Sequence, residues 1–125
     1  MKSLSAKLVL VLIALGLTIC YGEARAADWK ELAEATTGIF HYDAADISTT
    51  PEGFRRVWVY NVTEQEANLV EINCTGRKYH SLDVIQYAEG NRIKSRETYY
   101  DNPVQNWYDI PPKSVLEPLY KVVCQ

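Results

Sequence analysis

The order of apolar and polar residues along the chain predicts a small β-rich domain that ends in a helix. Residues 54–62 carry the clearest strand signal, because Val57-Trp58-Val59-Tyr60 is apolar on both sides of the pleat. This is typical of a central strand covered on both faces, or of a strand in a dimer contact. Residues 69–74 alternate instead, and Cys74 falls in phase with the apolar positions. This alternation predicts a strand whose cysteine points into the core.

Further strands are predicted on both sides of these two. The turn signal Thr36-Thr37-Gly38 predicts a hairpin between the segments that flank it. Downstream, residues 78–87 and the more polar residues 92–98 predict a second pair, of which the polar strand suits a sheet edge. Alternation within 78–87 places Tyr79 and Tyr87 on the same face.

The C-terminal residues 114–124 predict a short helix. Ser114 and Glu117 have the spacing of a capping box, in which Ser114 is the N-cap. Apolar residues follow at i, i+3, i+4 and i+7, which gives the helix one apolar face. These residues are Leu116, Leu119, Tyr120 and Val123. Cys124 lies next to this stripe, where it can meet Cys74.

The first 26 residues predict a secretory signal peptide. Lys2 and Lys7 precede an apolar run at 8–19, and Ala24-Arg25-Ala26 offers small residues at the positions that a signal peptidase reads. The apolar run is too short to cross a hydrocarbon core of about 30 Å, so no integral membrane span is expected after cleavage. The domain prediction is a signal peptide at 1–26 and a single domain at 27–125.

Export leaves two destinations open, the periplasm and the cell surface or medium. A bacterial lipoprotein would be cleaved before Cys20 and acylated on it, but that processing requires a small residue where Ile19 stands. A lipid anchor at Cys20 is therefore not expected.

The cysteines complete the predicted fold. The chain has three cysteines, and removal of the signal peptide leaves Cys74 and Cys124, which in an exported protein are most simply one disulfide. Closing a loop of about 50 residues stabilises a fold by about 4 kcal/mol in the chain-entropy model. The predicted fold class is α+β, an antiparallel sheet of five or six strands with a C-terminal helix tethered to one face by a disulfide.

The charge balance excludes one class of partner and suggests another. The chain has 13 basic and 16 acidic residues, a net charge of −3, so nucleic acid is not an expected partner. Two basic pairs, Arg55-Arg56 and Arg77-Lys78, stand out near strand ends as candidate contacts to an acidic partner or a polyanionic glycan. The plainer interpretation is that these four residues are solvated turn residues flanking strands.

No catalytic, cofactor or metal motif is present in the sequence. His41 and Asp43 would share a strand face, but this spacing alone does not define a metal site. Ser114 is explained as a helix cap, and the cysteines lack Cys-x-x-Cys spacing. A ligand pocket between helix and sheet would need polar residues facing it, and the inward positions that can be identified are apolar. These are Val70, Ile72, Leu119 and Val123. Neither an enzyme nor a bound cofactor is expected.

Several short patterns occur in an order that resembles a known family. They are an N-terminal tryptophan, Val57-Trp58-Val59, Glu71-Ile72-Asn73-Cys74 followed by Arg77-Lys78-Tyr79, Trp107-x-x-Ile110-Pro111-Pro112-x-Ser114, and a closing Val123-Cys124. The mature chain resembles the bacterial surface-adhesin protein E family. The resemblance implies an antiparallel sheet whose disulfide-bound C-terminal helix lies on the concave face, and a tendency to form homodimers. It also implies binding to host matrix proteins such as vitronectin and laminin.

The leading hypothesis from the sequence is a non-enzymatic extracytoplasmic module that binds a protein partner from host matrix or from its own envelope. The alternative is a structural or assembly component of a periplasmic envelope complex, which the unlipidated signal suits better.

Overall fold

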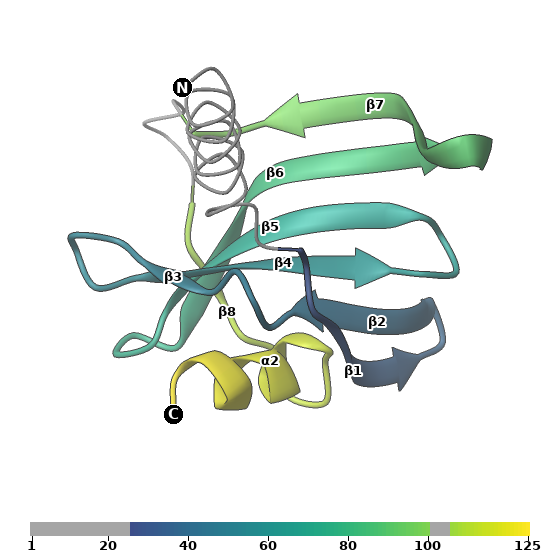
Figure 1. Cartoon of the computed structure of the whole chain (residues 1–125). Coiled ribbons are helices and arrows are strands. Elements are labelled where there is room, and N and C mark those ends of the chain that lie inside the picture. The colour runs from purple at the N-terminus through teal and green to yellow at the C-terminus, as the bar shows by residue number, and fades with distance from the viewer. Residues whose placement is uncertain (1–25, 101–105) are drawn as a thin grey trace, which may run out of the picture.

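The computed structural model describes residues 26–100 and 106–125 (Figure 1). The predicted signal peptide and Cys20 fall on residues 1–25 and lie outside the described part, apart from Ala26. The elements in chain order are β1 (Trp29–Ala35), β2 (Gly38–Asp43), β3 (Ser48–Thr49), β4 (Arg55–Asn61), β5 (Glu66–Asn73), β6 (Lys78–Ala88), the 3₁₀ turn η1 (Glu89–Asn91), β7 (Arg92–Thr98), β8 (Tyr108–Asp109) and the helix α2 (Leu116–Val123).

Within the described residues the strands form one antiparallel sheet of eight strands, with the order β1-β2-β4-β5-β6-β7 (Figure 1). The two-residue strands β3 and β8 pair with β4 and β6. The prediction of five or six strands was therefore too low, because two residues are too short to show a strand period. The predicted hairpin is formed by β1 and β2, β4 lies inside the sheet, and β7 lies at an edge.

One face of the sheet packs against α2, and the core lies between them. Its buried side chains alternate along β4 and β5 and are joined by two residues of the helix, as the apolar patterns predict. The buried cluster consists of Val57, Val59, Val70, Ile72, Ile110, Leu119 and Val123. Leu119 and Ile72 have no exposed surface. The helix therefore covers the apolar face of the sheet, which would otherwise be exposed to solvent.

Cys74 and Cys124 form the predicted disulfide, with their Cα atoms 5.6 Å apart. The hydroxyl of Tyr120 donates a hydrogen bond of 2.7 Å to the backbone carbonyl of Cys74. The Arg77 guanidinium lies over the ring of Tyr120, 4.8 Å from its centroid. Three contacts of different kinds thus fix the C-terminal helix to the turn that follows β5.

The helix begins later than its sequence predicts, because Ser114 is not its N-cap. A cap at Ser114 would need its carbonyl to accept a bond from the amide of Pro118, which has no N–H. The first i to i+4 bond runs instead from Leu119 to the carbonyl of Val115, the actual cap residue. The hydroxyl of Ser114 donates to Pro111, and Glu117 accepts from the amide of Lys113.

A β-bulge in β6 reverses the alternation of its side chains between the two faces of the sheet. The register with β5 shifts between Leu69 and Val70, so that one residue of β6 is left without a partner. Tyr79 consequently packs against the core under α2, whereas Tyr87 faces the opposite side of the sheet. The prediction that both tyrosines share one face was wrong, because a single inserted residue reverses a period of two.

Gly38 allows the hairpin of β1 and β2 to approach β4 closely. Its φ is +146°, and a Cβ atom there would overlap the amide of Asn61. Asn61 cannot move freely, because it donates to the carbonyl of Thr37 and accepts two bonds from backbone amides of the β4–β5 turn.

We expect Gly38→Ala to lower the free energy of unfolding by about 2 kcal/mol, since it adds both backbone strain and a collision. Chemical denaturation of the purified protein measures this loss. Gly53→Ala is the matched control, because Gly53 has φ +90° but open space around it. This variant should lose less unfolding free energy than Gly38→Ala. Equal losses in the two variants would show that the contact with Asn61 is unimportant.

Candidate functional site

The face of the sheet opposite α2 carries the candidate site. Neighbouring residues of a strand point to opposite faces, so Tyr60 points away from the core that holds Val59. Trp29 reaches the same face from β1, where it lies opposite Asp43 in register. Among the described residues, no α-helix packs on this face.

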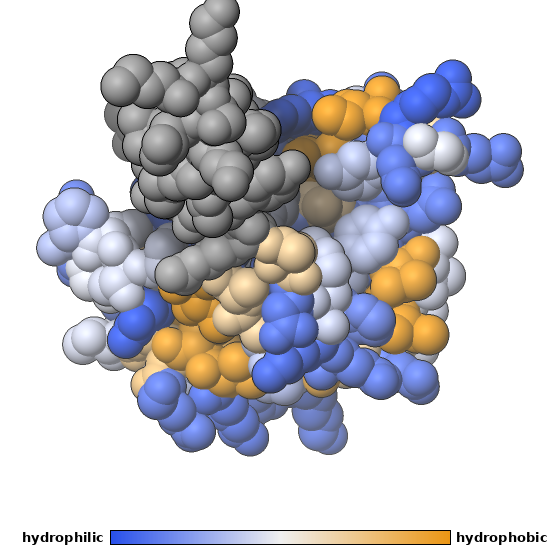
Figure 2. Space-filling view, in the orientation of Figure 1, coloured by the Kyte–Doolittle hydropathy of each residue, from blue (hydrophilic) through white to orange (hydrophobic). Residues whose placement is uncertain are grey.

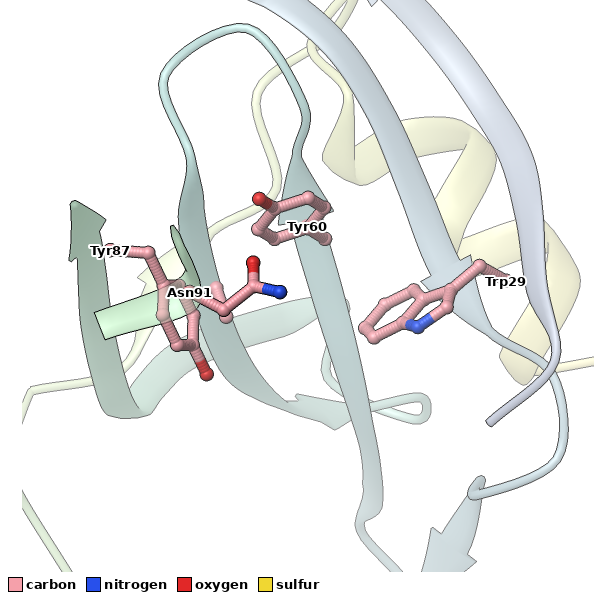
Figure 3. Close-up of a pocket in the computed structure, with 5 residues that line it drawn as sticks. Trp29, Tyr60, Tyr87 and Asn91 are labelled. Atoms are coloured by element: carbon pink, nitrogen blue, oxygen red, sulfur yellow. The ribbon is translucent and has the colours of Figure 1, made fainter. Parts of the chain in front are cut away.

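A cavity of about 320 Å³ opens on this face and is called the aromatic pocket below. It is lined by Trp29, Tyr60, Ala67, Tyr87 and Asn91 (Figure 3). The centroids of the Trp29 and Tyr60 rings are 5.9 Å apart, and those of Tyr60 and Tyr87 are 6.3 Å apart. The three rings come from β1, β4 and β6, so only the folded sheet brings them together.

Asn91 reaches the aromatic pocket because η1 turns the chain sharply between β6 and β7. Gly90 and Asn91 both have positive φ, 75° and 60°. Glycine adopts this conformation without strain, and asparagine tolerates it better than most residues. Figure 3 shows the Asn91 amide between the rings of Tyr87 and Trp29. The pocket thus combines three flat apolar surfaces with one planar polar group.

A buried ionic cluster lies on the same face, four residues away along β4 and β5 from the pocket residues Tyr60 and Ala67. Glu71 has a side chain only 7% exposed and accepts a 2.7 Å bond from Arg56 Nε. Its other oxygen lies 2.7 Å from Nε2 of His80, which is also buried. The ring of Trp107 stacks on His80 with a centroid distance of 3.7 Å. Arg56, Glu71 and His80 come from β4, β5 and β6, so this cluster ties three strands together, although Nδ1 of His80 is buried without a hydrogen-bond partner among the described residues.

A second ion pair joins β6 to the edge strand β7. Asp83 is fully buried, and both of its oxygens accept bonds from Arg96, at 3.1 and 2.6 Å. The hydrogen bond and the charge of Asp83 raise the pKa of the Arg96 guanidinium above its ordinary value. This pair orients β7, whose residues are otherwise all exposed.

The first basic pair predicted as a partner contact, Arg55 and Arg56, begins β4. Arg55 donates a 2.7 Å bond to the hydroxyl of Thr49 in β3. Arg56 belongs to the cluster with Glu71, and its guanidinium also lies 5.8 Å from the ring centroid of Tyr100. Both arginines therefore have intramolecular contacts.

The second basic pair consists of Arg77 and Lys78. Arg77 lies in the turn before β6, and Lys78 is the first residue of β6. Arg77 covers Tyr120, and Lys78 forms a 3.2 Å ion pair with Asp109 of β8. The sheet register places Arg55 opposite Ile72, and Ile72 opposite Tyr79, so the two basic pairs share one end of the sheet. Their role in partner binding stays a prediction.

A second cavity, of about 360 Å³, lies between α2 and the sheet. The apolar inward positions predicted from sequence are confirmed as buried, but Glu66 and Asn68 also line this cavity. The side-chain oxygen of Asn68 is buried and has no hydrogen-bond partner among the described residues. This polar side was not predicted from the sequence, although Asn68 lies two residues before Val70 and therefore shares its face.

The described residues contain no group of three metal-binding side chains, and none of their helices is long and apolar enough to cross a membrane. His41 lies on β2 and pairs in register with Glu31 and Tyr60.

These features define a class of protein, a small antiparallel β-sheet domain with a disulfide-tethered terminal helix and an aromatic pocket on its other face. The model of the surface-adhesin protein E family matches residues 29–125, and the chain belongs to this family. No curated protein and no solved structure is significantly similar to the chain.

Proposed function

We propose that this protein is a non-enzymatic, extracytoplasmic protein-binding module that uses the sheet face opposite α2 to hold a partner from host matrix or from the envelope. The observation that carries the proposal is the aromatic pocket, because it is an exposed aromatic surface in a member of a surface-adhesin family. Tyrosine and tryptophan supply large contact areas at low entropic cost and are enriched at the centres of protein interfaces.

The location of the four basic residues supports a second, charged contact area in this proposal. They gather at the end of the sheet formed by the start of β4 and the β5–β6 turn. Lys78 and Arg56 are about half-exposed even though they have partners. Such rim charges accelerate and orient association more than they strengthen it.

Adhesion requires display outside the outer membrane, so protease treatment of intact producing cells is the first test. We expect added protease to remove the protein while a periplasmic control protein survives. Protection of the protein, with full digestion after permeabilisation, would contradict adhesion and favour the alternative, an assembly component of a periplasmic envelope complex.

A pull-down with the purified protein then tests the partner. Immobilised matrix proteins and solubilised envelope proteins should be compared at the same salt concentration, with Trp29→Ala as the matched variant. Specific capture from the matrix set supports the adhesin role, whereas co-purification with one envelope complex supports the alternative. Capture of neither would contradict a protein-binding function.

A further inference from the structure

We propose that the aromatic pocket binds an extended, proline-containing segment of the partner protein, followed by acidic residues that lie over the edge strand β7. This inference rests on the proposed protein-binding function and names the kind of segment that is recognised. Three features of the pocket carry it: the spacing of its rings, its free hydrogen-bonding groups and the charge of the strand beside it.

The spacing of the rings matches a polyproline II segment. Such a segment rises about 3.1 Å per residue, so two residues advance by about 6.2 Å. The ring centroids in the pocket are separated by 5.9 and 6.3 Å along the row from Trp29 through Tyr60 to Tyr87. One gap between rings therefore accommodates one X-Pro dipeptide, with the proline ring packed against an aromatic face. Aromatic-lined grooves in other folds recognise proline-rich segments in the same way.

The polar groups at the pocket suit a ligand that mainly accepts hydrogen bonds. Trp29 can only donate through its indole nitrogen, and the hydroxyls of Tyr60 and Tyr87 and the amide of Asn91 can also donate. None of these four side chains has a hydrogen-bond partner among the residues that the structure describes. A polyproline II segment has no internal hydrogen bonds, and proline lacks the N–H, so its carbonyls are free to accept.

The charges around the pocket indicate acidic neighbours in the bound segment. Among the described residues that line the pocket none is charged, so the residues bound inside it should be neutral. β7 has the sequence RIKSRET and is exposed along its whole length. Arg92 follows Asn91 directly, and Lys94 follows Ile93, which pairs with Tyr87. Within the described residues neither cation forms an ion pair.

Figure 2 shows hydrophilic residues along the rim that β7 occupies, interrupted by a hydrophobic patch. The row of rings runs across the strands, so a segment that continues past Tyr87 would cross the edge strand β7 at Ile93 and bring carboxylates near Arg92 and Lys94 on either side of it. Because these cations are exposed, the contact should depend on salt and contribute chiefly to orientation.

The experiment uses the purified protein with its disulfide intact and a pool of labelled Pro-x-x-Pro peptides that have randomised x positions and a glutamate-rich flank. Binding is followed by fluorescence anisotropy. We expect saturable binding of the pool, at least tenfold weaker binding by Trp29→Ala, and several-fold weaker binding by Lys94→Glu. Tyr108→Ala is the matched control, because Tyr108 is an exposed aromatic residue on β8, outside the pocket.

Two comparison pools decide what is recognised. A pool with glycine in place of proline should not bind, and a lysine-flanked pool should bind more weakly than the glutamate-flanked pool. Equal binding of the proline and glycine pools, or unchanged binding by Trp29→Ala, would overturn the proposal. Displacement of the peptide by a neutral oligosaccharide, with no effect of the proline positions, would overturn it in favour of a sugar site.

The outcome is separable from that of the proposed function. If the protein captures a matrix or envelope protein in the pull-down but does not bind the proline pool, the proline proposal fails and the protein-binding function stands. If it captures no protein, the proposed function fails whatever the peptide pools show.

Discussion

Replacing both cysteines, Cys74→Ser with Cys124→Ser, is expected to lower the free energy of unfolding by about 4 kcal/mol. The disulfide closes a loop with a sequence separation of 50, and the loss of this constraint enlarges the unfolded ensemble. Stabilities of small domains are typically about 5–15 kcal/mol, so this loss is a large fraction of the total. A domain of this size should melt about 15–30 °C lower.

The structure adds a reason why the effect should reach the helix. α2 has only eight residues, and an isolated helix of that length is not stable in water. Without the disulfide, Leu119 and Val123 hold the helix only through burial, together with the bond from Tyr120 to the carbonyl of Cys74.

Circular dichroism melting curves with and without a reducing agent measure the effect of the disulfide. The double serine variant should match the reduced protein and should not respond to the reductant. A melting temperature of the native protein that is unchanged by complete reduction would contradict this prediction. Tyr120→Phe is a useful comparison, because it removes one hydrogen bond and should lose only about 1 kcal/mol.

The second large effect is expected from Glu71→Ala, which removes the centre of the buried ionic cluster. His80 would keep a buried ring with neither nitrogen paired, since its Nδ1 already has no hydrogen-bond partner among the described residues. Arg56 would lose its carboxylate while remaining partly covered. Breaking a buried ion pair at one partner typically destabilises a protein by about 3–5 kcal/mol. Because Arg56 is partly exposed, we expect a loss at the low end of this range, about 3 kcal/mol.

Glu71→Gln separates charge from hydrogen bonding at this position. The amide keeps the size and one acceptor oxygen, so we expect its loss of unfolding free energy to be smaller than that of the alanine variant. Chemical denaturation of the two variants and the native protein provides the comparison. Equal stability of all three proteins would show that the cluster contributes nothing to the fold.

The same cluster shows where sequence reasoning reached its limit. Glu71 alternates with Val70 and Ile72, and this pattern predicts a solvent-exposed carboxylate on a half-buried strand. The structure buries Glu71 because Arg56 and His80 come from the strands on either side of β5. No local pattern contains this information, since the residues that satisfy the charge are paired only through the sheet register.

The four basic residues show a related limit. Their sequence positions predict exposed turns and strand ends, and the structure confirms the turn position for Arg77 and the strand ends for Arg55 and Lys78. What sequence could not show is that each has an intramolecular partner. The aromatic pocket was missed for the same reason, because Trp29, Tyr60 and Tyr87 are distant in sequence and lie on three different strands.

Local patterns along the chain were enough to predict the β-rich fold with its terminal helix, the central and edge strands, the apolar stripe of α2 and the pairing of Cys74 with Cys124. These features depend on local periods and on a simple count of cysteines, which can be read along one chain. The reversal of faces in β6, the buried ionic cluster and the aromatic pocket become visible only in the folded protein. Each of these depends on register between strands, and a single residue in register is enough to move a side chain from one face of the sheet to the other.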